Sequence, residues 1–378
     1  MLRFSCSSLL TLVLVMVGGS VAWSAIGKAQ NASSTTAQSL LFRWSQFTAD
    51  GTPEERSIYP DDVTSCPGGT TERPSLPWMT GDFSVRICSH QLAGELPNVK
   101  KIVVIGDTGC RVRLQDRCNE RSWPLKIIAN LAAQKRPDLV IHLGDYLYRE
   151  CPDNNLLCAD RSLGNRWSAW QEDFFEPAKT LLEAAPWIFV RGNHESCDRQ
   201  AEGWVRLLSP KPGELTCGRP EPPYLLQFRN INFVIVDSSI APFIGHFQSP
   251  DLTKTTSPTW MLSHRPFHAL NAPLSDNTNI DFILSGHVHD FGAYTVAGPI
   301  GVEQFVVGTG GTKLDENPEG KFPVGATIVS SHGYLLITNQ DDKWIATLYG
   351  LSGKNSTAEK VIASCTIQGP ATRCITEQ

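Results

Sequence analysis

Short apolar runs recur along the middle of the chain, and each run ends in a polar stretch. The runs lie at Lys101–Ile105, Leu139–Leu143, Trp187–Val190, Thr259–Ser263 and Phe282–Leu284. Apolar runs of this length, bounded by Gly, Asp and Asn, predict buried strands. Trp123–Gln134 and Trp167–Leu182 have apolar residues at helical spacing and predict two helices. The alternation of strands and helices predicts an α/β fold.

Strand patterns flank this part of the chain on both sides. From Ser39 to Asn98, short apolar pieces between scattered Pro and Gly residues predict a small β-rich N-terminal region, 39–99. Further strands are predicted at Phe228–Asp237, Phe305–Val307, Leu335–Thr338 and Trp344–Tyr349. We therefore expect one large domain over 100–352, followed by a disulfide-closed tail, 353–378.

The N-terminal residues predict export. Arg3 is followed by an apolar run from Leu9 to Val17 and then by small residues, which is the pattern of a secretory signal peptide over 1–24. The apolar run is too short to span a bilayer comfortably. A polar segment, 25–38, predicts a linker. We expect a secreted or periplasmic protein with no stable membrane insertion after the signal is removed.

The cysteines agree with an oxidising compartment. Cys6 lies in the leader, and the other ten of the eleven cysteines fall in near neighbours. The neighbours are Cys66 and Cys88, Cys110 and Cys118, Cys151 and Cys158, Cys197 and Cys217, and Cys365 and Cys374. Five local disulfides are the simplest interpretation. Thiolate metal ligation is the alternative, since Cys110 and Cys197 closely follow Asp107 and His194, but the chain has no Cys-x-x-Cys.

The polar stretches after the apolar runs hold residue types that bind metal ions. They are Gly106–Gly109, Gly144–Tyr148, Gly192–Glu195, His264–Pro266 and Gly286–His289. A single stretch of this kind would be explained by an ordinary turn. Five in series, each after a strand, predict a single cluster, because loops from several strands meet outside their carboxyl ends. The predicted members are Asp107, Asp145, Tyr148, Asn193, His264, His287 and His289.

These side chains are more numerous than one ion requires. Their oxygens and imidazole nitrogens suit two ions, and Asp145 is the natural bridging ligand. Two ions about 3.5–4 Å apart clamp the attacking and leaving oxygens of a displacement and lower the pKa of bound water to about 7. The expected reaction is hydrolysis by a metal-bound hydroxide, without a covalent protein nucleophile.

In combination, these motifs resemble those of the calcineurin-like metallophosphoesterases and, within them, the purple acid phosphatases. The resemblance covers roughly Lys101–Tyr349 and includes the Gly-rich turn Gly308–Gly311. Gly109 stands where most of the superfamily has a histidine ligand, and Tyr148 matches the tyrosine that purple acid phosphatases use instead. The resemblance implies two packed mixed β-sheets flanked by helices, an αββα sandwich, here with the small β-rich extension.

The resemblance also implies the metals and the reaction. A ferric ion, Fe(III), would be held by Asp107, Asp145, Tyr148 and His289. A divalent ion (zinc, manganese or iron) would be held by Asp145, Asn193, His264 and His287. The implied reaction is hydrolysis of phosphate monoesters, often best in acid. His194 matches a histidine that binds phosphate or protonates the leaving group, and its alternative role is a structural hydrogen bond.

The expected substrate is a small phosphorylated compound. Arg111 and Arg265, together with His194, are the predicted substrate-binding residues, because guanidinium groups recognise phosphate. Other arginines near the motifs are Arg113, Arg149 and Arg191. His194 and Asp145 are the predicted catalytic residues.

Net charge and motif content limit the alternatives. The formal charge is −5, or −5 − 1 = −6 without Arg3, which disfavours binding to nucleic acid. No His-x-His-x-Asp-His run occurs, which disfavours a metallo-β-lactamase-type hydrolase. Two alternatives to a phosphomonoesterase stay open: a phosphodiesterase on the same scaffold, and an exported metal-binding protein without catalysis.

Overall fold

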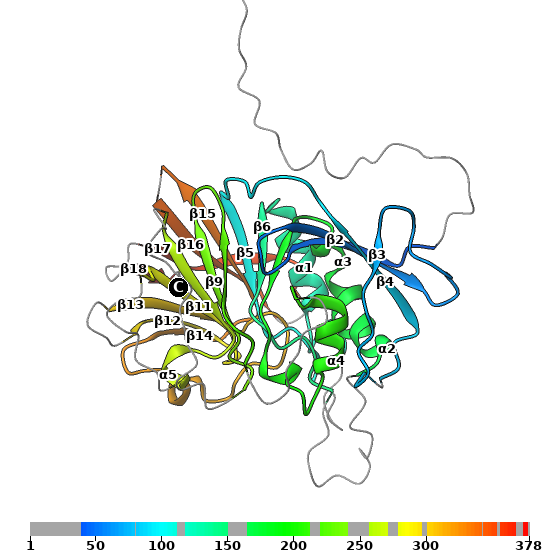
Figure 1. The fold of residues 1–378 in the computed structure, drawn as a ribbon. Coiled ribbons are helices and arrows are strands. Elements are labelled where there is room, and N and C mark those ends of the chain that lie inside the picture. Colours follow the sequence, from blue (N-terminus) through cyan, green and yellow to red (C-terminus); the bar gives the residue numbers. More distant parts are fainter. Residues whose placement is uncertain are drawn as a thin grey trace, which may run out of the picture. The chain divides into compact units, whose positions relative to one another are not determined.

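The computed structural model describes residues 39–79, 81–111, 118–149, 165–211, 220–240, 257–270, 279–296, 301–341, 343–353, 356–367 and 373–376. All of them belong to one unit, Gln38–Gln378. Two mixed β-sheets with few helices make up this unit (Figure 1), which confirms the predicted α/β class. The predicted signal peptide and linker lie outside the described residues.

The larger sheet is built from both ends and the middle of the described chain. Its strands are β1 (Phe42–Phe47), β2 (Pro53–Pro60), β3 (Thr71–Glu72), β4 (Val85–Gln91), β5 (Lys101–Ile105), β6 (Leu139–His142), β7 (Trp187–Phe189), β15 (Gly333–Gln340), β16 (Lys343–Leu351), β17 (Glu359–Ile367) and β18 (Arg373–Thr376). They lie in the order β18-β17-β16-β15-β5-β6-β7-β1-β2-β4-β3. The central strands β5, β6 and β7 are parallel, and β1 adds to β7 in parallel.

The smaller sheet comes from the region between β7 and β15. Its strands are β8 (Tyr224–Gln227), β9 (Asn232–Val236), β10 (Thr259–Ser263), β11 (Phe282–Ser285), β12 (Phe291–Val296), β13 (Val302–Val307) and β14 (Thr327–Val329). They lie in the order β14-β12-β13-β11-β10-β9-β8, with β9, β10, β11 and β13 parallel. The predicted strand Phe228–Asp237 starts too early, because Phe228 and Ile231 close a turn and the strand begins at Asn232.

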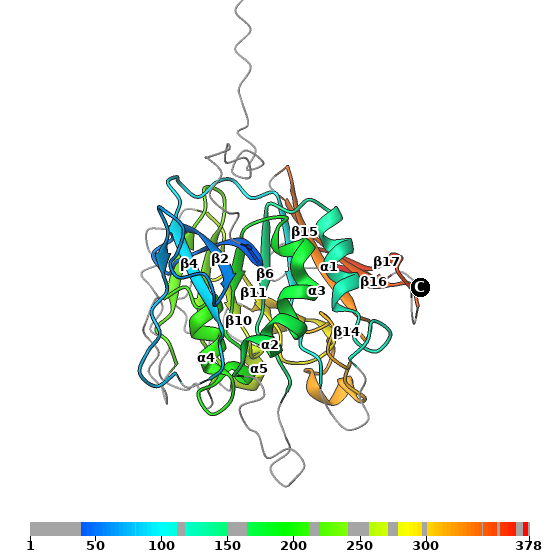
Figure 2. The same ribbon diagram turned by 90° about the vertical axis from the view of Figure 1, so that its right-hand side faces the viewer.

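Helices cover the outer face of the larger sheet. The longer ones are α1 (Leu125–Gln134) and α3 (Glu176–Leu182), which pack against each other (Figure 2). The predicted helix over 167–182 is present as α2 (Trp167–Trp170), the π-helical η4 (Gln171–Phe175) and α3. Shorter elements are η5 (Asn193–Glu195), α4 (Ala201–Gly203), η6 (Trp204–Leu208), α5 (Phe267–Leu270) and η7 (Pro318–Lys321).

The two sheets pack face to face because the strand residues alternate between two apolar layers. In β5, Val103 and Ile105 enter the core beneath the helices. Trp260 of β10 contacts Trp344 of β16 with ring centroids 5.0 Å apart, which joins the two sheets. Strands buried on both faces require nearly continuous apolar sequence. The polar residues that follow β5, β6, β7, β10 and β11 therefore come at the strand ends, where ligands bind in such folds.

The N-terminal and C-terminal strands extend the larger sheet at its two edges. The predicted β-rich N-terminal region is present, and its strands β1 to β4 continue the sheet beyond β7. Arg56 of β2 is fully buried and donates to the carbonyls of Leu207 and Ser209 at 2.6 and 2.7 Å, which ties this region to the end of η6. The predicted domain boundaries stay predictions, and the sheet runs across them.

Disulfides are present in the described residues. They join Cys66 to Cys88, Cys110 to Cys118 and Cys365 to Cys374. Cys197 is also disulfide-bonded, while its predicted partner Cys217 and the predicted pair Cys151–Cys158 lie outside the described residues. Because Cys110 and Cys197 are both in disulfides, neither is a thiolate ligand, and that alternative is wrong.

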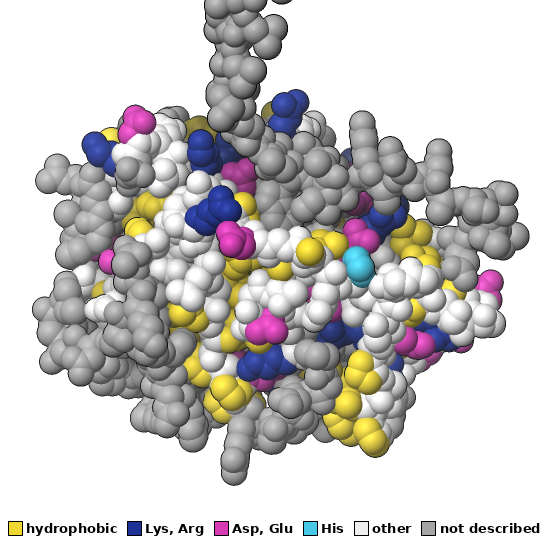
Figure 3. Space-filling model, turned by 45° about the horizontal axis from the view of Figure 1, so that its top comes forward, with side chains coloured by type: hydrophobic (Ala, Val, Ile, Leu, Met, Phe, Trp, Pro, Cys, Tyr) yellow, Lys and Arg dark blue, Asp and Glu magenta, His cyan; other side chains and the backbone are white. Residues whose placement is uncertain are grey.

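Two further observations concern the described residues. Within the described ranges, no helix is long and apolar enough to cross a membrane. On the face drawn in Figure 3, the coloured acidic and basic side chains are interspersed rather than gathered by sign.

Candidate metal centre

Several of the predicted ligands have a strained backbone. The φ angles are +56° at Asp107, +59° at Asp145 and +75° at His287. Non-glycine residues rarely adopt this left-handed region, which costs roughly 1–3 kcal/mol and clusters at functional sites. The loops after β5 and β6 hold each other, since the Asp107 N–H donates to the Gly144 carbonyl at 3.0 Å. The strain turns these side chains toward a common point.

The Tyr148 hydroxyl lies at the centre of a first group of donor atoms. Its oxygen is 2.9 Å from Asp107 Oδ1, 3.1 Å from Asp145 Oδ2 and 3.0 Å from His289 Nε2. All four side chains are buried. Tyr146 lies elsewhere, because its hydroxyl donates to the Val190 carbonyl at 3.0 Å. Of the two neighbouring tyrosines, only Tyr148 therefore joins the cluster.

The space around Gly109 is too small for a histidine side chain at position 109. A Cβ atom at Gly109 would lie 2.5 Å from the Tyr146 carbonyl oxygen and 2.6 Å from the Leu147 Cα. Backbone atoms of the loop after β6 thus fill the space of any side chain at position 109. With the two loops this close, the Tyr148 hydroxyl lies within hydrogen-bond distance of Asp107 and His289.

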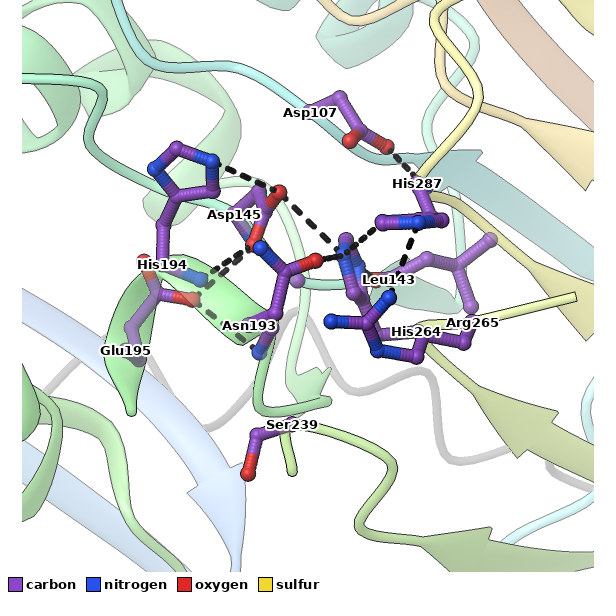
Figure 4. A network of polar contacts seen from close by, with 12 residues as sticks. Asp107, Leu143, Asp145, Asn193, His194, Glu195, Ser239, His264, Arg265 and His287 are labelled. Carbon is purple, nitrogen blue, oxygen red and sulfur yellow. Dashed lines mark hydrogen bonds and ion pairs between the residues drawn. The ribbon is translucent and has the colours of Figure 1, made fainter. Parts of the chain in front are cut away.

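Asp145 also belongs to a second group of donors, with Asn193, His264 and His287 (Figure 4). His264 Nε2 is 3.0 Å from Asn193 Oδ1 and 3.2 Å from Asp145 Oδ2. His287 Nδ1 is 3.3 Å from His264 Nε2. Donor atoms of Asp145, His264 and His287 all lie within 4.8 Å of one another, as a metal site requires. Asp145 Oδ2 is therefore shared between the two groups, and the structure brings all seven predicted residues together.

The pKa values of the acidic groups in the cluster are shifted in different directions. Burial raises the pKa of Asp107 to about 8, and the nearby Asp145 charge adds to this rise. Burial acts in the same direction on Asp145, but the imidazoles of His264 and His194 outweigh it and hold the Asp145 pKa well below its usual range. Burial and the two carboxylates raise the pKa of Tyr148 well above its usual value. A neighbouring cation would oppose the raised pKa values of Asp107 and Tyr148 and lower that of Asp145 further, which favours the ionised form of all three groups.

Two of the three histidines are in the form that binds metals. Burial and the neighbouring His264 lower the pKa of His287 to about 2, and burial and Arg111 lower that of His289 to about 3. Burial lowers the pKa of His264 as well, but the charge and hydrogen bond of Asp145 raise it to about 9. Neutral imidazole is the ligand form. With oxygen donors, nitrogen donors and one shared carboxylate, the residues fit a pair of metal ions.

Glu195 supports the cluster from beneath, a role that sequence reasoning missed. Its buried carboxylate accepts the backbone N–H groups of Asp145 at 3.1 Å, Tyr146 at 2.9 Å and Gly192 at 3.0 Å. Burial, with the Asp145 charge second, raises its pKa to about 8. The three bonds join two loops and hold Asp145 in its strained conformation. Only the motif Gly-Asn-His-Glu pointed to this residue, and a motif does not say which N–H groups a carboxylate faces.

His142 was missed because it lies within an apolar strand. It is fully buried in β6, and burial lowers its pKa well below the usual value. Its Nδ1 accepts the Gly144 N–H at 3.1 Å, so the neutral ring carries its proton on Nε2 and donates to Thr108 Oγ1 at 2.9 Å. His142 therefore links the turns that carry Asp107 and Asp145.

The two predicted substrate-binding arginines contact the outer nitrogens of the histidines. Arg111 Nη2 lies 3.1 Å from His289 Nδ1, and Arg265 Nη1 lies 3.1 Å from His287 Nε2. Ser238 fixes Arg265 by accepting from its N–H at 2.8 Å and from its Nε at 3.1 Å. Neither guanidinium forms an ion pair with a carboxylate of the described residues.

The other arginines near the motifs do not share this position. Arg149 pairs with Asp173 at 2.8 Å and Arg191 with Asp237 at 3.2 Å, so both are neutralised within the fold. Arg113 lies outside the described residues. Among the arginines of the described motifs, Arg111 and Arg265 are thus the ones placed beside the donor atoms.

His194 borders the cluster opposite Arg265. Figure 4 shows its ring on one side of Asp145 and the side chains of His287 and Arg265 on the other. His194 Nε2 is 3.8 Å from Asp145 Oδ2, and its ring packs 4.2 Å from that of Tyr148. Its backbone N–H donates to Asp145 Oδ1 at 2.9 Å. The side chain is partly exposed, so it can meet a bound molecule.

Two facing mixed sheets, with oxygen and nitrogen donors gathered at their strand ends, are the architecture of a metallophosphoesterase. The family model described as calcineurin-like phosphoesterase matches residues 100–291, and the chain belongs to this family. Membership supports a metal-binding phosphoesterase, a hydrolase that acts on a small phosphorylated substrate. No curated protein matches the chain significantly.

Solved structures share the fold at low sequence identity. One is a purple acid phosphatase isolated from yellow lupin (Lupinus luteus) seeds, with a TM-score of 0.57, 13% identity, and coverage of 86% of this chain and 74% of that one. Another is PhoD, with a TM-score of 0.54, 12% identity, and coverage of 92% of this chain and 94% of that one. These similarities confirm the two-sheet fold that the sequence motifs predict.

Proposed function

We propose that the protein is an exported, dinuclear phosphomonoesterase of the purple acid phosphatase kind. One observation carries the proposal: Asp145 Oδ2 lies 3.1 Å from Tyr148 Oη and 3.2 Å from His264 Nε2, and so belongs to both donor groups. A shared carboxylate oxygen is what a bridging ligand provides. The first ion is assigned to Asp107, Asp145, Tyr148 and His289, and the second to Asp145, Asn193, His264 and His287.

The chain's own residues have separable tasks in this reaction. The bound metal pair supplies Lewis acidity toward the phosphoryl oxygens and an activated water near neutral pH. Arg111 and Arg265 bind phosphate oxygens by charge-assisted hydrogen bonds, since neither guanidinium is paired with a carboxylate in the part of the chain that the structure describes. His194 lies on the side of Asp145 opposite Arg265 (Figure 4). There it contacts the bound phosphate ester and donates a proton from Nε2 to the leaving oxygen.

The preference for monoesters rests on the balance of charge around the cluster. A monoester phosphate carries up to two negative charges, and a diester carries one. The two guanidiniums favour the more highly charged monoester phosphate, and His194 can protonate its leaving oxygen. Export is supported by the disulfides Cys66–Cys88, Cys110–Cys118 and Cys365–Cys374, which persist in oxidising compartments.

Turnover of paired substrates tests this assignment. The purified protein is assayed with p-nitrophenyl phosphate and with bis(p-nitrophenyl) phosphate, which release the same chromophore. We expect kcat/KM to be higher for the monoester by at least about tenfold, a difference of about 1.4 kcal/mol in barrier. A preference for the diester would refute the monoesterase and favour a phosphodiesterase on this scaffold. No turnover of either ester would favour the non-catalytic metal-binding alternative.

The ferric assignment rests on Tyr148 and has its own test. A phenol has a free pKa of about 10, and burial raises the pKa of Tyr148 further, so only a strongly acidic metal would bind it as phenolate. Iron(III) phenolate absorbs visible light, and the oxidised protein should be violet. Tyr148→Phe should lose the colour, and Tyr146→Phe, whose hydroxyl bonds Val190 instead, should keep it. A colourless active protein holding only zinc or manganese would contradict the ferric ion.

A further inference from the structure

The segment between β13 and β14 touches the first donor group at two places. The Thr312 N–H donates to the Asp107 carbonyl at 3.0 Å. Further along, Asp315 Oδ2 accepts the backbone N–H of His289 at 3.0 Å, and Asp315 Oδ1 lies 4.0 Å from His289 Nδ1. The Asp315 side chain is only 10% exposed. The Asp315 carboxylate thus holds the backbone of His289 by a hydrogen bond, and its charge lies near the ring nitrogen that Arg111 Nη2 contacts at 3.1 Å.

Lys321 fixes the Asp315 carboxylate from the other side. Its Nζ lies 2.6 Å from Asp315 Oδ1, and the ammonium group is half-exposed. The Lys321 carbonyl in turn accepts a hydrogen bond from His268 Nε2 at 2.9 Å, which anchors the end of η7 to α5. Phe322, the next residue, is buried in the core of the smaller sheet. Asp315 is therefore held between an anchored cation and His289.

The neighbouring acidic residue provides a contrast. Glu316 pairs with Lys313 at 3.1 Å, and these two side chains are 79% and 55% exposed. Glu316 has the same charge as Asp315 and comes one residue later, yet its only ion-pair partner among the described residues is this exposed lysine. The two residues carry the same charge, so they differ in burial and in the contact of Asp315 with His289.

We propose that Asp315 is a positioning residue for His289, and that it sets the affinity of the first donor group for its ion. The proposal rests on the proposed metal centre. A carboxylate that holds the backbone of a ligand histidine, with its charge near the ring, restricts the position of the imidazole, and removing an outer partner of a ligand typically weakens metal binding about 10–100-fold. Lys321 holds Asp315 in place and has no direct contact with the donor atoms among its described ion pairs and hydrogen bonds.

The test compares two isosteric changes in the metal-loaded protein. Asp315→Asn removes the charge and keeps an oxygen that can accept the His289 N–H, while Glu316→Gln makes the same charge change at the exposed site. Each protein is dialysed against a series of chelator concentrations, and the ions retained per chain are counted by elemental analysis. We expect Asp315→Asn to bind the first ion about 10–100-fold more weakly and the second ion normally. Glu316→Gln should retain both ions as the native protein does.

Several results would overturn the proposal. Native retention of both ions by Asp315→Asn would do so, as would equal weakening of both ions in a folded variant. If Asp315→Asn does not fold, Lys321→Met is measured instead, and its expected effect is about a twofold to fivefold weakening of the first ion, the range of an exposed ion pair. Unchanged binding in Lys321→Met would then refute the inference. A native protein that binds no metal would refute the proposed function itself. A protein that binds two ions with affinities unchanged in Asp315→Asn would refute only this inference.

Discussion

Asp145→Asn is the substitution that should damage the site most, because both donor groups share this carboxylate. The change keeps the side-chain shape and removes one negative charge from a residue that is 1% exposed. Asp145 Oδ2 lies 3.2 Å from His264 Nε2, and breaking a buried charge pair of this kind costs about 3–5 kcal/mol. If a bound cation loses an interaction of the same size, its binding weakens by about 10²–10⁴-fold. We expect both ions and the turnover of phosphate monoesters to be lost together.

A matched control separates this loss from damage to the fold. Asp173 is also 1% exposed, and its carboxylate pairs with Arg149 at 2.8 Å, away from the donor atoms. Asp173→Asn should lower thermal stability and leave metal content unchanged. Elemental analysis and p-nitrophenyl phosphate turnover are measured on the same samples of both variants. An Asp145→Asn protein that retains both ions and native turnover would refute the reasoning, and selective loss of one ion would refute the bridging role.

Three further outcomes follow from the same contacts. His194→Ala should slow alkyl phosphates more than p-nitrophenyl phosphate by up to about 10²–10⁴-fold, because phenolate leaves unaided, and equal slowing of both substrates would exclude proton donation. Glu195→Gln should lower the free energy of unfolding in denaturant by about 1–3 kcal/mol, since an amide N–H would face a backbone N–H, whereas native stability would show that the three bonds are dispensable. Metal binding at pH 7 should release protons, because the pKa values of His264 and Asp107 are raised to about 9 and 8 and both groups are protonated below those values. Affinity should therefore rise as pH increases toward 9, and calorimetry in buffers of different ionisation enthalpy that detects no proton release would contradict the assignment.

The ends of a strand could be predicted from the sequence where its buried apolar run and its backbone hydrogen bonds end at the same residue. Lys101–Ile105 and Thr259–Ser263 are strands with the predicted ends, because Gly106 and His264 begin polar stretches there. The prediction for Phe228–Asp237 started early, since Phe228 and Ile231 are buried in a turn. Apolar sequence reports burial and does not distinguish a strand from a buried turn.

The residues of the candidate site could be predicted where they directly follow the end of a strand. Seven residues that the sequence places after strands come together in the structure, while their roles as ligands stay a prediction. The supporting residues were not predictable, because their roles depend on which backbone groups they face. Glu195 bonds a loop 50 residues earlier in the chain, and Asp315 contacts His289 across 26 residues. The left-handed backbone of Asp107 has only a weak signal in residue type, since Asp adopts positive φ more often than most residues but still rarely.

Metal content measured together with turnover tests the central claim most directly. The native protein is analysed for ions per chain and assayed with p-nitrophenyl phosphate, then treated with chelator, and assayed again during stepwise return of metal. The account predicts two ions per chain, loss of turnover when they are removed, and recovery that is complete only when both return. Full turnover of a protein holding no ion, or one ion per chain, would contradict the dinuclear phosphoesterase.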